Sequence, residues 1–227
     1  MLQNNQANQP EAQVTGSLQA TGKVKLDLLV LGAMAQRAQI YLLNLAADTS
    51  FPLVDYIERP RKRIHRIVVY NQQEILLKSN LVFVGFVSRI QEHVSPAIIQ
   101  ELHRVDKLLI TELANHAGLL SYSSLELHKD HWYNLVLLSD YTAKTYFKDN
   151  STHRYAAHQL ATHFYAWIRL HNGVMPGGLV YNQLILQRTK YYTFPEIGQK
   201  PVMWEVLYDG VTCSGSPLFS ANRSSDK

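Results

Sequence analysis

The segment from Ser151 to Gly173, STHRYAAHQLATHFYAWIRLHNG, holds four of the ten histidines of this 227-residue chain, with two tyrosines, a phenylalanine and a tryptophan. Histidine titrates near neutral pH, so it can act as a general acid or base, and its neutral ring can bind a metal. Aromatic rings often line pockets for small apolar ligands. These residue types therefore indicate either a ligand site or the aromatic side of a core helix.

The whole segment is predicted to be one helix. Ser151 or Thr152 can cap its start, and Asn172-Gly173 can end it, because glycine adopts the left-handed conformation readily. Its apolar stripe, at helical spacing, is expected to comprise Ala157, Leu160, Ala161, Phe164 and Ile168.

Helical spacing divides the histidines of this segment. His153 and His171 extend the stripe at opposite ends, about 27 Å apart at roughly 1.5 Å per residue, so they cannot share one metal. His163, Trp167 and His171 are successive i,i+4 neighbours and form a ladder along one flank. The ladder has three interpretations: rings covering the margin of a sheet, the wall of a ligand site, or ligands of a metal or haem. His153 is the candidate catalytic residue, with packing or hydrogen bonding as its alternative role.

A ligand pocket between sheet and helices is expected to be lined by aromatic side chains and a second histidine, namely Tyr122, Trp132, His163, Phe164 and Trp167. At the HKDH turn, His128 and His131 with Asp130 could bind a metal, but the spacing fixes no further ligand, and no metal site is predicted. The chain lacks the H-E-x-x-H, G-x-S-x-G, P-loop and G-x-G-x-x-G motifs. Its single cysteine, Cys213, excludes an intramolecular disulfide and a zinc site of several thiolates.

A basic run, RPRKRIHR, carries most of the excess positive charge of a chain whose net charge is +4 and whose pI is about 9.1. Five cations in eight positions can engage phosphates of nucleic acid or anionic lipid. The run contains no aromatic residue on which bases could stack. A solvated loop or a salt-bridge site in a dimer is the alternative to an anionic partner at the five cations, Arg59, Arg61, Lys62, Arg63 and Arg66.

Composition divides the chain into four parts. Residues 1–22 and the end of the C-terminal extension at 195–227 are polar and are expected to be disordered. Residues 24–78 form an N-terminal extension of a helix at 27–47 and a strand at 66–71, and residues 80–194 form the main domain. The N-terminus lacks the charged and apolar regions of a signal peptide, and charged residues interrupt the longest apolar stretch. We therefore expect a soluble, cytoplasmic protein.

The main domain has the clearest pattern. Ser95 and Pro96 predict the start of a helix, and Gly118 its end. The expected order is strand 80–90, this helix, a hairpin of strands 119–127 and 132–138, a short helix 140–147, the helix 151–173 and a final strand 179–192. Strand, helix, strand, strand, helix, strand is the ferredoxin-like βαββαβ arrangement, so an α+β fold is predicted, an antiparallel sheet with both helices on one face.

A ferredoxin-like unit with a long aromatic second helix resembles the dimeric α/β-barrel superfamily. The run WYNLVLLSDYTAKTYFKDNSTHRYAAH, in which small residues follow His153, is similar to that of its antibiotic-biosynthesis-monooxygenase and haem-degrading members. The resemblance covers about 80–194. It implies a homodimer of face-to-face sheets and a small apolar or aromatic ligand between sheet and helices. The two extensions depart from the family unit, and either could cover the helix-free face in place of a second subunit.

Three functions are carried forward, because fold does not determine function. The first is a non-catalytic small-ligand-binding or homodimeric interaction protein. The second is a cofactor-independent monooxygenase-like enzyme for a small aromatic substrate, in which His153 steers protons. The third is binding of an anionic partner, nucleic acid or lipid, through the basic run. No cofactor is predicted, haem is kept as an alternative, and nucleic acid is the less favoured partner.

Overall fold

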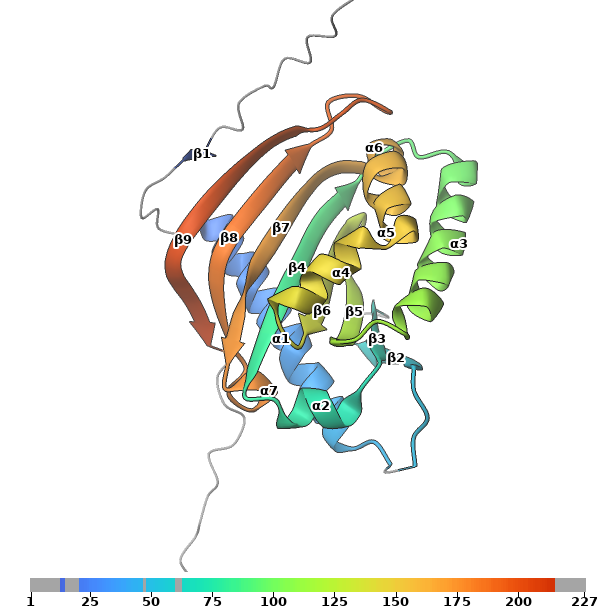
Figure 1. Cartoon of the computed structure of the whole chain (residues 1–227). Coiled ribbons are helices and arrows are strands. Elements are labelled where there is room, and N and C mark those ends of the chain that lie inside the picture. The colour runs from blue at the N-terminus through green and yellow to red at the C-terminus, as the bar shows by residue number, and fades with distance from the viewer. Residues whose placement is uncertain (1–12, 15–20, 47, 60–62, 215–227) are drawn as a thin grey trace, which may run out of the picture.

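In the computed structural model the described residues are 13–14, 21–46, 48–59 and 63–214, and their strands form one open, nine-stranded sheet (Figure 1). The order is β1-β9-β8-β7-β4-β6-β5-β3-β2, and all neighbours are antiparallel except β1 and β9. The strands are β1 (Gln13–Val14), β2 (Leu53–Arg59), β3 (Arg63–Val69), β4 (Asn80–Ile90), β5 (Leu119–His128), β6 (His131–Leu138), β7 (Tyr165–Pro176), β8 (Gln183–Thr193) and β9 (Val202–Ser214). The helices are α1 (Gly22–Leu43), α2 (Gln72–Leu77), α3 (Pro96–Leu113), α4 (Tyr141–Asp149), α5 (Ser151–Tyr155), α6 (Ala161–Phe164) and α7 (Gly178–Tyr181), with a π-helical turn η2 (Ala156–Leu160) between α5 and α6. The predicted α+β class is confirmed.

The elements from β4 to α4 form where local signals predicted them. The Ser95 hydroxyl accepts the Ile98 N–H at 3.4 Å and caps α3, which ends at Leu113, five residues before Gly118. Asp130, with φ 64°, closes the hairpin of β5 and β6. The Asp140 carboxylate accepts the Ala143 N–H at 2.9 Å and caps α4. These signals act within four residues, so they do not depend on the rest of the fold.

The helix predicted over 151–173 is wrong beyond Phe164. After α5, η2 and α6 the chain enters β7, which pairs with β4 from Tyr165 to Pro176. The residues YAWIRLHN alternate between two faces, as a strand requires, and they are rich in aromatic and branched side chains. The apolar stripe from Ala157 to Phe164 fits a helix, but Ile168 belongs to the strand. The predicted helical ladder of His163, Trp167 and His171 therefore does not exist.

The ends of the sheet contain the other differences. Strand β2, at residues for which no strand was predicted, pairs with β3 across the basic run. The strand predicted from Leu179 begins at Gln183, because Gly177, Gly178 and Asn182 have positive φ and turn the chain through α7. The C-terminal extension packs on the domain through pairing of β9 with β8.

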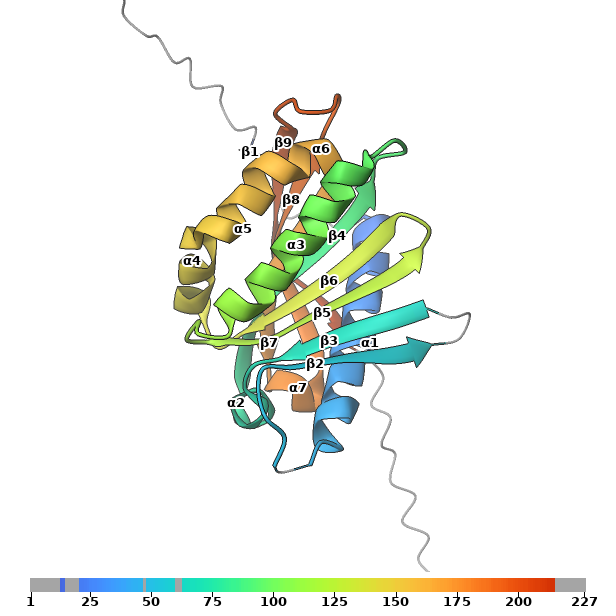
Figure 2. The same cartoon turned by 90° about the vertical axis from the view of Figure 1, so that its right-hand side faces the viewer.

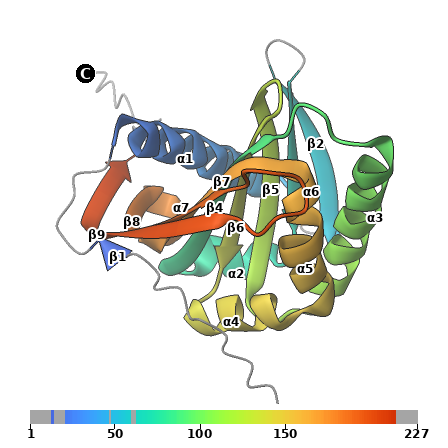
Figure 3. The ribbon, with the colours of Figure 1, turned by 90° about the horizontal axis from the view of Figure 1, so that it is seen from above.

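Helices cover both faces of this sheet (Figures 2 and 3). Helices α3 to α6 lie on one face, where Leu113 and Ala143 pack on Val82 and Leu138. Helix α1 crosses the other face and buries its side chains against Phe83 and its neighbours. The sequence left two possible covers for the face without helices, a second subunit or one of the extensions. In the structure the N-terminal extension covers this face through α1.

Helix α1 is the core helix of the larger layer. Its buried row, at steps of four and three residues, is Val24, Leu28, Leu31, Ala35, Ala38 and Leu42. A Cβ atom at Gly85 would lie 2.3 Å from the Leu31 side chain, so only glycine lets α1 approach β4 this closely. By length and composition alone α1 could cross a membrane, but 44% of that window is buried within the protein.

The disorder predicted for 1–22 and the C-terminal end concerns residues that lie mostly outside the described ranges. Within those ranges, Thr21 caps α1, accepting the Val24 N–H at 3.5 Å, and α1 begins at Gly22, five residues before the predicted start.

Candidate functional site

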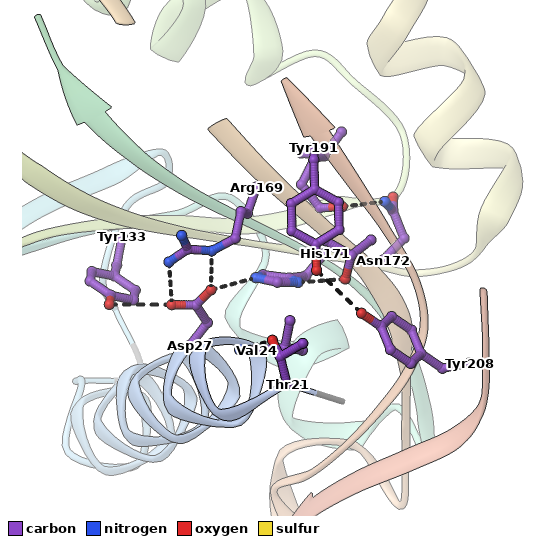
Figure 4. A network of polar contacts seen from close by, with 11 residues as sticks. Thr21, Val24, Asp27, Tyr133, Arg169, His171, Asn172, Tyr191 and Tyr208 are labelled. Carbon is purple, nitrogen blue, oxygen red and sulfur yellow. Dashed lines mark hydrogen bonds and ion pairs between the residues drawn. The ribbon is translucent and has the colours of Figure 1, made fainter. Parts of the chain in front are cut away.

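A buried carboxylate joins α1 to the centre of the sheet (Figure 4). Asp27, 1% exposed, accepts hydrogen bonds from Arg169 Nε at 2.6 Å and Nη2 at 2.9 Å. His171 Nε2 lies 3.0 Å from the same carboxylate, and the Tyr133 hydroxyl donates to it at 3.4 Å. The Arg169 guanidinium also lies 4.2 Å above the Trp167 ring. Every lone pair of Asp27 thus has a partner from β6 or β7.

Three members of this network have the order hydroxyl, imidazole and carboxylate that hydrolases use. Thr189 Oγ1 lies 2.9 Å from His171 Nδ1, and Asp27 lies on the opposite ring nitrogen. A nucleophile must reach its substrate, yet Thr189 and His171 are both 0% exposed. The network therefore serves structure: it holds α1 in register on the sheet, and it leaves no space for a reacting group.

The acid–base state of the network follows from burial and hydrogen bonding. Burial alone would raise the pKa of Asp27, but the hydrogen bonds from His171 and Arg169 outweigh it and hold that pKa below its usual value. Burial, reinforced by the Asp27 charge, raises the pKa of Tyr133 to about 12, so its hydroxyl remains a donor at neutral pH. A buried charge with this many partners is stable only while all of them stay in place.

The two faces of the central strands differ in how completely they are covered. Facing α1, Phe83 and Leu137 are 0% exposed and Leu135 is 1% exposed. On the same strands, the surface turned toward α3 to α6, which we call the helix-side face, buries Val82, Leu138 and Ile168 but leaves other apolar side chains partly exposed, namely Val84, Phe86, Val136, Leu170 and Val174. The helices therefore cover this face less completely than α1 covers the other.

Polar atoms without partners lie on the same helix-side face. Strand register places Ser88, Trp132 and Asn172 on it, and Tyr70 packs against the same apolar cluster. The buried Tyr70 Oη, Ser88 Oγ, Trp132 Nε1 and Asn172 Oδ1 have no hydrogen-bond partner among the described residues. Such groups cost free energy unless a ligand or water satisfies them, so they mark separate polar positions at which this face could bind a ligand.

One predicted pocket residue, Tyr122, lies at the centre of a polar cluster beside this face. Its hydroxyl donates to Asn134 Oδ1 at 3.1 Å, and the Arg66 guanidinium lies 5.3 Å above its ring. Arg66 Nη2 donates to Asp106 of α3 at 2.9 Å, and Nη1 binds the same carboxylate. Burial raises the pKa of Tyr122, which keeps its phenol neutral. The Arg66–Asp106 pair fixes the distance between α3 and the sheet.

The other predicted pocket residues are divided between two faces. Trp132 lies on the helix-side face with Tyr122. Trp167 faces α1, on the opposite side, where it contacts the His131 ring at 5.8 Å. Phe164 is 7% exposed at the end of α6 and packs on Tyr165, and His163 is exposed near Gly198. Five residues predicted to share one pocket therefore do not meet, because the strand β7 begins where a helix was expected.

The candidate catalytic residue, His153, lies on α5 and is partly buried. Its backbone N–H is capped by Asn150 Oδ1 at 2.8 Å. Burial, with smaller effects from His158 and Lys148, lowers the pKa of the His153 ring to about 4. The ring is therefore neutral at pH 7 and a weak base, which suits packing better than proton transfer.

The basic run is the connection between β2 and β3. Arg61 and Lys62 lie outside the described residues, as does the side chain of Arg59. Arg63 is partly buried, and Arg66 is bound to Asp106, so it is not available to an external phosphate. At Arg66 the run thus forms an ion pair within the chain, and the salt bridge expected in a dimer stays a prediction.

Sequence reasoning missed Asp27 and Arg169. Asp27 was treated as an interruption of an apolar segment and as a helix start. A single carboxylate within LDLLVL must find a cation if that segment is buried, and this rule could have signalled a buried partner. Nothing local identifies the partner, which lies 142 residues away.

Among the described residues no group of three His, Cys, Asp or Glu side chains could hold a metal ion. The His128 and His131 rings at the hairpin turn are 6.4 Å apart and pack edge to face. Comparison of the chain with models of protein families, with curated proteins and with solved structures returns no match. The resemblance to the dimeric α/β-barrel superfamily stays a prediction.

Proposed function

We propose that this protein is a non-catalytic ligand-binding protein, and that a small apolar or aromatic ligand occupies the helix-side face beneath α3 and α5. The observation that carries the proposal is the contrast between the two faces of the central strands. Phe83 and Leu137 are sealed beneath α1, whereas Val84, Phe86 and Val136 on the other face are not. Partly exposed apolar area between the sheet and its helices gains free energy when a ligand covers it.

The unpartnered polar atoms support the same location. Tyr70 and Trp132 offer donors, and Asn172 offers an acceptor, beside apolar side chains. Ligand sites generally combine an apolar lining with a few such groups, which fix the orientation of the ligand. The buried network at Asp27 holds the opposite face rigid, so the sheet can act as a preformed floor.

We also propose that β4 to β7 form a ferredoxin-like unit. Its support is the local strand order β7-β4-β6-β5, with α3 between β4 and β5 and the helices α4 to α6 between β6 and β7. The last strand of this unit is β7, not the strand at 179–192 expected from the sequence. Strands β2, β3, β8 and β9 then extend the unit at both edges.

Fluorescence titration with the uncharged probe N-phenyl-1-naphthylamine tests the ligand proposal. We expect saturable binding, and we expect the filling double substitution Val84→Phe and Val136→Phe to weaken it at least tenfold with the fold retained. Val54→Phe on the edge strand β2, where the side chain is 38% exposed, is the matched control and should leave binding unchanged. No saturable binding to the wild-type protein would refute the proposal.

The enzyme alternative depends on His153 and has its own test. A cofactor-independent oxygenase should consume oxygen with an activated phenol, and His153→Gln should abolish that activity while probe binding stays intact. The weak basicity of a ring whose pKa is about 4 favours the non-catalytic function.

We further propose that two copies associate as a homodimer through α1. The observation is a second row on this helix, on its outer side, at strict steps of three and four residues: Leu26, Leu29, Ala33, Gln36, Ile40 and Leu43. The four large apolar members are 42% to 63% exposed. Apolar residues at heptad spacing are the seam that one helix offers to another, so the second copy of α1 is the partner.

A further inference from the structure

Four cations converge at the β8 end of the helix-side face. Lys144 and Lys148 belong to α4, and Arg188 and Lys190 belong to β8. The charges of Arg188, Lys148 and Lys190 all reach the Lys144 amine. The carboxylate of Glu205 lies 3.4 Å from Lys190 and 3.7 Å from Arg188. Among the described residues Glu205 thus pairs with two of the four cations, while Lys144 and Lys148 form no ion pair, and this excess of positive charge attracts an anion.

The Lys144 amine belongs to the more buried of the two α4 lysines. It is partly buried, and no carboxylate of the described residues forms an ion pair with it. Burial, followed by repulsion from Arg188, Lys148 and Lys190, lowers the pKa of Lys144 to about 8. An anion placed there would relieve both effects, because an opposite charge favours the protonated amine.

Strand register connects the cations to the apolar part of the helix-side face. One row across the sheet runs from Phe86 to Leu170 and then to Lys190. The adjacent row runs from Val84 to Asn172 and then to Arg188. Directly opposed residues on neighbouring strands lie about 4.5–5.5 Å apart, so the charge begins within about two strand spacings of the apolar floor.

We infer that the ligand of the helix-side face is an acidic amphiphile, whose anionic head pairs with Lys144, Arg188 and Lys190 and whose apolar body lies on Val84, Phe86 and Leu170. The inference rests on the proposed ligand-binding function and names the chemical class of the ligand. A single carboxylate or phosphate head matches the charge, because Glu205 already neutralises part of the cation cluster.

Displacement of N-phenyl-1-naphthylamine by decanoate and by decanol at pH 7 tests this inference. The two competitors share an apolar chain and differ in charge. We expect decanoate to displace the probe at a concentration at least tenfold lower than decanol. Equal displacement, better displacement by decanol, or none by either would overturn the inference. Absence of probe binding in the wild-type protein would instead refute the proposed function, so the two failures are distinguishable.

Substitution of Lys144 tests whether the anionic head pairs with this lysine or is attracted by the overall positive charge. Lys144→Met should remove the advantage of decanoate over decanol and leave decanol displacement unchanged. Lys25→Met, at an exposed lysine of α1 beyond the opposite face, is the control and should preserve that advantage. Lysine ¹³Cε resonances supply a second readout: saturating decanoate should raise the pKa of Lys144 toward the ordinary value of about 10.4. An unchanged Lys144 titration in the presence of bound decanoate would contradict the pairing.

Discussion

Asp27 is the residue on which the α1 layer depends most. Asp27→Ala would leave Arg169 and His171 without their shared acceptor in the core. Removing one partner of a buried ion pair costs about 3–5 kcal/mol, and we expect that loss in the free energy of unfolding measured with urea. The exposed Asp48→Ala is the control, expected within about 0.5 kcal/mol of wild type. A similar stability for both variants would show that the network is not required.

The stability of the protein is expected to depend on pH through the single residue His153. Its folded-state pKa, about 4, lies below the unfolded value of about 6.5, so the unfolded state binds more protons between these values. Stability from this group is complete above about pH 6.5 and decreases as the pH falls toward 4. His153→Gln should flatten the stability profile in that window. An unchanged slope in urea unfolding between pH 6.5 and 4.5 would contradict the assignment. Asp27, whose pKa is lowered, changes the stability only below about pH 4, which is outside this window.

Lys144 should react as an unusual amine. With a pKa of about 8, about half of it is unprotonated at pH 8, whereas an exposed lysine is almost wholly protonated. We therefore expect acetic anhydride to label Lys144 with a rate midpoint near pH 8, as read by peptide mass spectrometry. A rate that still rises steeply above pH 9 would contradict the repulsive cluster.

At the scale of elements, the contact between α1 and β4 sets how closely the layers approach. A methyl group at Gly85 would overlap Leu31, and overpacking of this kind costs about 1–3 kcal/mol. Leu31→Ala alone would leave a cavity at a cost of about 2–5 kcal/mol. The double variant Gly85→Ala with Leu31→Ala should be more stable than the sum of the two losses implies, because the new methyl fills the space vacated by leucine. Simple additivity in urea unfolding would show that the two residues do not compete for space.

The sequence predicted a helix or hairpin correctly where a local signal marked its start or its turn. The helix at Pro96 has a serine cap and a proline, and the hairpin around Asp130 has a turn residue with positive φ. The prediction failed at β7, because Phe164 and Ile168 satisfy a helical step while Trp167, Arg169 and His171 satisfy a strand step. Pairing with β4 along the whole of β7 decides in favour of the strand. The deciding partner, β4, lies about 80 residues away in the chain, so the local sequence around β7 does not contain this information.

The proposed site is built from elements that lie far apart in the chain. The α+β pattern predicted a pocket between sheet and helices, and of its predicted residues Tyr122 and Trp132 lie on the helix-side face, while the pocket itself stays a prediction. Trp167 and His163 were assigned through a helix that ends too early. The cation cluster forms only because β8 pairs with β7, which brings Arg188 and Lys190 toward Lys144 of α4. The local sequence around each of these residues therefore did not predict the cluster.

At the same scale, the outer row of α1 makes the proposed homodimer testable. Leu29, 56% exposed, lies near the middle of the N-terminal half of that row, and a charge there would be buried in the dimer but solvated in the monomer. Leu29→Glu should therefore convert a dimer into a folded monomer, with the mass measured by light scattering after gel filtration. Leu77→Glu, at a 75% exposed leucine of α2, should leave the dimer intact. A wild-type protein that is monomeric at all concentrations, or that dimerises equally well with Leu29→Glu, would refute the α1 interface. An exposed apolar row on a helix is expected to pack either on a protein partner or on a membrane. A monomer that binds lipid vesicles through the same leucines would therefore show that this row binds a membrane surface.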